Sequence, residues 1–134
     1  MNYKANCAAE TSDKIIVYQE NRSKLIINNP RSSTVTKVIV DGCEITSGIR
    51  CDFLVVKDKY EYFIELKGHD LDHAISQIKE SIRLLSDKKT PKTCLIVCHR
   101  SPLSASKIQN LQSLFKKQLS AKLIIKSSPH TIDI

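Results

Sequence analysis

Tryptophan is absent from this 134-residue chain, whose aromatic residues are limited to four tyrosines and three phenylalanines. Proteins that bind single-stranded nucleic acids without sequence preference stack the bases on aromatic side chains, so this composition argues against a stacking platform as the main device. Apolar runs also fall far short of the ~20 residues that a membrane-spanning helix requires. Because the first ten residues lack the apolar core of a secretion signal, we expect a cytoplasmic protein with no membrane partner.

Several motifs of common enzyme classes are missing as well. The sequence contains no Gly-x-x-x-x-Gly-Lys, Gly-x-Gly-x-x-Gly, Gly-x-Ser-x-Gly or His-Glu-x-x-His pattern. These patterns cradle phosphates, bind dinucleotides, hold a nucleophilic serine or bind catalytic zinc. Their absence disfavours nucleotide-driven enzymes, dehydrogenases, serine hydrolases and zinc peptidases.

The five cysteines do not suggest a disulfide framework, because their number is odd and the expected compartment is reducing. Zinc is also a poor fit. Cys94 and Cys98 lie in one apolar run, and in a strand their Cα atoms would be about 13 Å apart, too far to share one ion. We expect the cysteines to act mainly as small buried residues.

Positive charge is unevenly distributed along the chain. Residues 88–134 contain nine Lys or Arg and one acidic residue, whereas residues 1–87 contain twelve basic and thirteen acidic ones. The C-terminal part could therefore offer a positive surface to a polyanion such as DNA or RNA. The alternative is a solvated basic face that maintains solubility.

The length predicts a single domain over residues 1–134, with residues 1–14 as a loosely held N-terminal arm. Residues 71–85 carry apolar side chains at three- and four-residue intervals behind a capping Asp70, which predicts a helix. Ser101 and Pro102 can begin a second helix. Residues 15–18 and 24–28 suggest a hairpin, although a helix there is left open. Further strands are predicted over 35–40, 43–46, 51–57, 62–67, 94–98 and 121–126, with a tight Asp41-Gly42 turn joining the first two.

This order of elements predicts an α/β fold with a mixed β-sheet flanked by helices. The segment between the strand that ends at Lys67 and the strand that begins near Cys94 has the length of a crossover between parallel strands.

Asp52, Glu65 and Lys67 form the candidate functional set. Asp52 stands near the start of one predicted strand, and the alternation of the next strand places Glu65 and Lys67 on the same face. Two carboxylates beside an ammonium group could bind a divalent metal and handle an attacking water, as metal-assisted phosphodiester hydrolysis requires.

On these residues, with Gln77 in the following helix, the chain resembles the PD-(D/E)XK nuclease superfamily, whose restriction-endonuclease-like fold includes Holliday junction resolvases. The resemblance covers about residues 35–126. It implies that Asp52, Glu65 and the Leu66 carbonyl bind Mg²⁺ or Mn²⁺, and that Lys67 orients or deprotonates the attacking water. Gln77 would match a glutamine that some branches place beside the lysine. The proline that gives the family its name is replaced by Cys51.

Many resolvase-like members add an acidic residue from an upstream helix, and Glu20, Asp41 and Glu44 are all candidates for that role here. Candidate contacts to nucleic acid are the basic residues Arg50, Arg100, Lys107, Lys116 and Lys117.

The resulting expectation is a metal-dependent endonuclease that hydrolyses DNA and acts as a homodimer or as a subunit of a larger complex. Two alternatives stay open: a catalytically inactive DNA-binding or assembly subunit with the same fold, and a nuclease directed at RNA.

Overall fold

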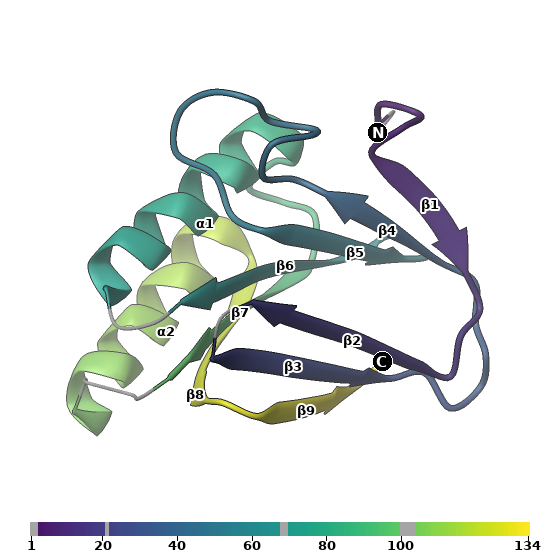
Figure 1. The fold of residues 1–134 in the computed structure, drawn as a ribbon. Helices are drawn as coiled ribbons and strands as arrows, with labels where there is room; N and C mark the ends of the chain where they lie inside the picture. Colours follow the sequence, from purple (N-terminus) through teal and green to yellow (C-terminus); the bar gives the residue numbers. More distant parts are fainter. Residues whose placement is uncertain (1–2, 21, 68–69, 100–103) are drawn as a thin grey trace.

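The computed structural model describes residues 3–20, 22–67, 70–99 and 104–134, with the side chain of Lys67 left out of that description. These residues form nine strands and two helices (Figure 1). The elements are β1 (Ala8–Thr11), β2 (Ile15–Glu20), β3 (Ser23–Asn28), β4 (Val35–Ile39), β5 (Phe53–Lys57), β6 (Tyr60–Lys67), α1 (Leu71–Leu85), β7 (Lys92–Cys98), α2 (Ala105–Leu119), β8 (Ala121–Ser127) and β9 (His130–Asp133).

The elements stack in three layers. The central layer is a six-stranded sheet in the order β1-β4-β5-β6-β7-β8, and a smaller sheet has the order β2-β3-β9. One buried cluster joins α1 and α2 to the central sheet, and a second joins β2 and β3 to its other face. Figure 1 shows the helices and the small sheet on opposite sides of the large one.

The central sheet is mixed, which confirms the predicted α/β class. Strand β5 pairs antiparallel with both β4 and β6, whereas β7 pairs in parallel with both β6 and β8. Helix α1 makes the crossover from β6 to β7, and α2 makes the one from β7 to β8. All seven residues of β7 are buried, as its apolar sequence predicts for a central strand.

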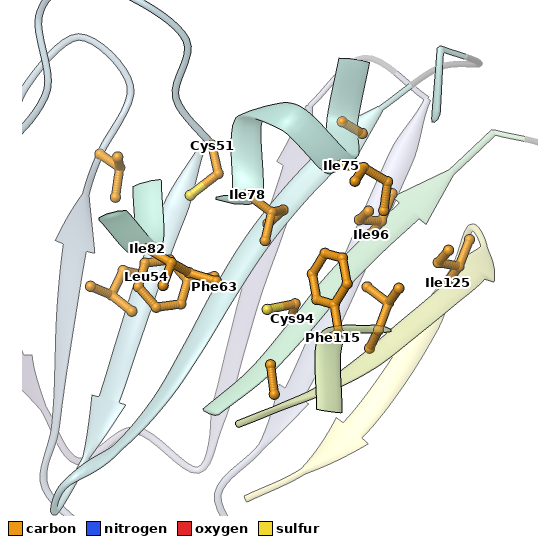
Figure 2. Close-up of a cluster of buried hydrophobic side chains, with 14 of the residues drawn as sticks. Cys51, Leu54, Phe63, Ile75, Ile78, Ile82, Cys94, Ile96, Phe115 and Ile125 are labelled. Carbon is orange, nitrogen blue, oxygen red and sulfur yellow. The ribbon is translucent and has the colours of Figure 1, made fainter. Parts of the chain in front are cut away.

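Helix α1 begins and packs as its sequence predicts. The Asp70 side chain accepts a hydrogen bond from the backbone N–H of His73, which satisfies one of the free donors of the first turn. Figure 2 shows Ile75, Ile78 and Ile82 of this helix directed at side chains of the central sheet. None of the described helices is long and apolar enough to cross a membrane.

Helix α2 has a different cap from the predicted one. Ser104 accepts a hydrogen bond from the backbone N–H of Lys107, and the helix begins at Ala105. Ser101 and Pro102 lie outside the described residues.

The prediction for residues 35–46 is correct for the strand and wrong for the hairpin. Gly42 adopts a φ of +77°, which suits glycine in a tight turn. The chain then folds back at once, because the Ile45 N–H donates to the Val40 carbonyl and the Gly42 N–H donates to the Ile45 carbonyl. These short-range bonds leave residues 43–46 as a turn with a single bridge instead of a strand.

Two strands have no counterpart in the sequence-based predictions. The segment expected as an N-terminal arm contains β1, which pairs antiparallel with β4 at the edge of the central sheet. Near the C-terminus, β9 pairs in parallel with β3. The expected hairpin over residues 15–28 is confirmed as β2 and β3.

The expectation for the cysteines is wrong for two of the five. Cys7 and Cys43 form a disulfide that ties the residue before β1 to the turn after β4. Cys51, Cys94 and Cys98 are buried thiols, as predicted. Because disulfides persist in oxidising compartments, the Cys7–Cys43 bond removes one of the grounds on which a cytoplasmic location is expected.

Candidate functional site

Asp52 and Glu65 occupy neighbouring positions on adjacent strands. Strand β5 begins directly after Asp52, and its register with β6 sets Phe53 opposite Ile64. The Asp52 N–H donates to the Ile64 carbonyl, so Asp52 lies beside Ile64, the residue that precedes Glu65 in β6. Both side chains are buried, with 7% of Asp52 and 2% of Glu65 exposed. Their common location at one end of the central sheet meets the first requirement of the predicted site.

The Asp52 carboxylate is held by the backbone of β6. Its Oδ2 accepts a 2.8 Å hydrogen bond from the Leu66 N–H. Its own backbone N–H donates to the Ile64 carbonyl, and its carbonyl accepts from the N–H groups of Val40 and Asp41. Backbone contacts on both sides therefore fix the residue between β4 and β6.

The Leu66 carbonyl faces the same region. In an extended strand the N–H and C=O of one residue project toward the same neighbouring strand. Since the Leu66 N–H meets Asp52, the Leu66 carbonyl also projects toward the start of β5. It thus supplies a backbone oxygen on the side of β6 where Asp52 lies.

Glu20 at the end of β2 is the upstream acid that meets Asp52. The pKa of Asp52 is raised to about 6, mainly because burial removes the carboxylate from water. The Leu66 N–H opposes this rise, whereas the charges of Glu20 and Asp41 and a hydrogen bond between the Glu20 and Asp52 carboxyl groups add to it. Asp52 thus has neighbouring acids whose negative charge disfavours its ionised form.

The other upstream acids are placed differently. Asp41 is close enough to raise the pKa of Asp52, but its Oδ1 accepts a 2.7 Å hydrogen bond from Arg50 Nε. Glu44 is directed at the N-terminal segment, where Oε2 accepts from the Lys4 N–H. Sequence reasoning alone left the choice among these acids open because it could not place the β2–β3 sheet against the central one.

Gln77 lies beside this region from the helix side. Its Nε2 donates a 3.0 Å hydrogen bond to the Arg50 carbonyl, and its buried Oε1 has no hydrogen-bond partner among the described residues. Ser81, one turn further along α1, accepts a hydrogen bond from the Cys51 N–H. These two contacts attach α1 to the backbone that leads into Asp52.

The Cys51 thiol lies close enough to Asp52 and Glu65 for both charges to affect its pKa. Burial is the main cause that raises the pKa of its thiol to about 12, and the charges of Glu65 and Asp52 raise it further. The thiol is therefore protonated and inert at neutral pH. Figure 2 shows it directed into the core beneath α1, away from any role as a nucleophile.

The candidate basic residues divide into three groups. Lys67 is the last residue of β6, but its side chain lies outside the described part of the chain, as does all of Arg100. Arg50 is engaged by Asp41 and by the Gly48 carbonyl. Lys107, Lys116 and Lys117 are exposed along α2. The structure does not bring these three lysines into contact with the carboxylates.

The donor set can be compared with the needs of a metal ion. Over the described ranges, no group of three or more His, Cys, Asp or Glu side chains is arranged to hold a metal. Magnesium, however, binds through one or two carboxylates and keeps several waters, and it prefers oxygen ligands. Asp52, Glu65 and the Leu66 carbonyl offer only oxygen donors, and the neighbouring charges of Glu20 and Asp41 contribute to the raised pKa of Asp52. The residues present therefore fit a hard divalent cation.

No protein-family model, curated protein or solved structure matches the chain. The functional assignment therefore depends on the geometry of the site.

Proposed function

We propose that this protein is a metal-dependent nuclease that hydrolyses phosphodiester bonds of DNA. The observation that carries the proposal is the buried pair Asp52 and Glu65 at one end of the central sheet, with Asp52 bonded to the Leu66 N–H. Acidic side chains buried together at one end of a sheet, with a raised carboxyl pKa among them, are typical of functional sites. The strand order β4-β5-β6, followed by a crossover through α1 to β7, supports assignment to the restriction-endonuclease-like fold.

Each residue has a role in the proposed reaction. Asp52, Glu65 and the Leu66 carbonyl would hold Mg²⁺ or Mn²⁺, with Glu20 as a further carboxylate beside Asp52. The bound ion would stabilise the charge that develops on the phosphoryl oxygens and lower the pKa of a water. Lys67 would orient that water or accept its proton. Gln77 would keep the Arg50–Asp52 segment in place through its bond to the Arg50 carbonyl.

The substrate proposal depends on charge. The chain carries a formal net charge of +7, and most of the excess lies in the part that forms β7, α2 and β8. Such a surface binds the phosphate backbone more than base edges, so little sequence preference is expected. Cleavage of both strands of a duplex needs two sites, and we propose that two copies act together or that a larger assembly supplies the second site.

The test is a cleavage assay with plasmid, linear duplex, branched DNA and single-stranded RNA, each with Mg²⁺ or with EDTA. The proposal expects Mg²⁺-dependent cleavage of DNA that is lost in Glu65→Gln and in Lys67→Met. Exposed Glu10 and Lys88 offer matched controls, because Glu10→Gln and Lys88→Met make the same chemical changes far from Asp52. Cleavage that persists in Lys67→Met would reject the role of Lys67, and cleavage of RNA alone would correct the substrate.

One observation favours a second candidate, an inactive DNA-binding or assembly subunit. The described side chains contain no cluster of three metal-binding groups, and Asp52 is hydrogen-bonded to Glu20. A protein of this type would bind DNA in a salt-dependent manner, without metal uptake and without cleavage of any substrate. The same assay, combined with a binding titration, separates the two candidates.

A further inference from the structure

Strand β8 forms an open edge of the central sheet. Within the described ranges it pairs only with β7, so its other side has no strand neighbour. A groove of about 1160 Å³ runs between this edge and α2. Polar side chains along it include Gln109, Gln112, Lys116, Lys122, Lys126 and His130.

The hydrogen bonds to β7 show which N–H and C=O groups of β8 are free to pair with another strand. The Ser120 carbonyl accepts from the Lys92 N–H and the Ser128 N–H donates to the Cys98 carbonyl, so the even-numbered residues of this stretch face β7. The odd-numbered residues of β8 therefore direct their N–H and C=O groups into the groove. One of these groups, the Leu123 carbonyl, accepts a 3.0 Å hydrogen bond from Gln112 Nε2. Among the described residues, α2 makes no hydrogen bond to the backbone N–H and C=O groups of Ile125 and Ser127.

The groove combines an apolar wall with a basic rim. Ile108 of α2 and Leu123 and Ile125 of β8 line it, and Figure 2 shows Ile125 on the helix-facing side of the sheet. Lys116, Lys122 and Lys126 are exposed around it, and no aspartate or glutamate is among its lining residues. An extended chain with acidic and apolar side chains would complement both features.

We propose that the β8 edge binds an extended, acidic segment of a partner protein by strand addition. The partner backbone would pair with the outward N–H and C=O groups of β8, while its acidic side chains meet the lysines of the rim. This interaction does not depend on the proposed nuclease activity. It would give a small domain a means of joining a larger complex.

A second copy of this chain is a poor occupant. Antiparallel pairing of two β8 strands about Ile124 would place Lys122 of one copy opposite Lys126 of the other, and like charges at opposed positions destabilise a pair. Lysines on an edge strand commonly prevent such self-association. A nucleic acid would meet the lysines but would leave the outward backbone groups and the apolar wall unused.

The test begins with random peptides of about ten residues displayed on phage and selected on the full chain. The proposal expects enriched sequences in which Asp or Glu alternate with β-branched residues. Their synthetic forms should lose at least ~tenfold in affinity for Lys126→Glu, which reverses the charge of the rim, and for Gln109→Trp, which fills the groove. The matched controls on exposed positions outside the groove, Lys117→Glu and Asn110→Trp, should bind as the parent does.

Amide hydrogen exchange provides a second measurement, which distinguishes pairing with β8 from nonspecific adsorption of the peptide to the surface. Bound peptide should slow the exchange of the Ile125 and Ser127 amides, because these groups face the groove. Failure to enrich any peptide, enrichment without acidic residues, or equal binding by groove and control variants would overturn the proposal. If the groove variants weaken binding of duplex DNA and leave peptide affinity unchanged, the surface is a nucleic-acid site instead.

Discussion

The Leu66 N–H donates a 2.8 Å hydrogen bond to Oδ2 of Asp52, and this contact joins the two strands that carry the candidate carboxylates. It also orients the site. Asp52 also interacts with Glu20, which belongs to β2 of the small sheet. The site is therefore assembled from both sheets.

Stability should depend on pH through Asp52. Its folded pKa of about 6 lies above the ordinary value of 3.8, so the folded state binds more protons between these values. The free energy of unfolding should thus fall as pH rises from about 4 to 6, by up to about 3 kcal/mol for a shift of this size. Urea denaturation across this range measures the fall. A profile that rises with pH would contradict the buried, protonated state of Asp52.

Asp52→Asn should remove this pH dependence and stabilise the protein above pH 7. The asparagine Oδ1 can still accept from the Leu66 N–H, and its Nδ2 can donate to Glu20, so the packing is preserved without a buried charge. An increase of about 1–3 kcal/mol is expected at pH 8, with little difference at pH 4. Exposed Glu10→Gln is the matched control and should leave the profile unchanged.

The buried ammonium of Lys92 should be essential for stability at the other end of the sheet. Its Nζ donates to the carbonyls of Asp87, Thr90 and Leu119. Burial raises the pKa of Glu61, and the Ser86 hydrogen bond and the Lys92 charge oppose this rise. Lys92→Met would leave these acceptors without a donor and Glu61 without its cation, at a cost of about 3–5 kcal/mol. Lys88→Met is the exposed control. Equal denaturation midpoints for the two variants would refute the structural role of Lys92.

The disulfide should contribute through the loop that it closes. Cys7 and Cys43 are 36 residues apart, and closure of a loop of this length restricts the unfolded chain by about 3–4 kcal/mol. The variant Cys7→Ser/Cys43→Ser should lose that amount. Reduction should destabilise the parent and leave the double variant unaffected. Identical sensitivity of both proteins to reductant would show that the pairing does not stabilise the fold.

Short-range sequence patterns predicted helix α1 and strand β7 correctly. The apolar spacing of α1 and its Asp70 cap, and the buried run of β7, each specify an element within a short stretch of sequence. The location of Asp52 and Glu65 at the same end of the sheet follows from two consecutive antiparallel strands with a short connection, whereas their function stays a prediction.

Long-range pairings were not predictable in the same way. Strand β9 pairs with β3 across about a hundred residues, and no local signal marks this contact. The meeting of Glu20 with Asp52 follows from how the small sheet packs on the large one. The Asp41-Gly42 pair correctly indicated a turn, but bonds from Ile45 and Gly42 close the chain before a second strand can form.

The most direct test of the proposed metal centre is a crystal of the protein soaked in Mn²⁺, examined by anomalous scattering. The proposal predicts an ion about 2.1 Å from carboxylate oxygens of Asp52 and Glu65 and from the Leu66 carbonyl. Glu65→Gln, soaked in the same way, should lose the ion. No ion at this end of the sheet, or one bound only elsewhere, would contradict a metal-dependent nuclease at Asp52 and Glu65.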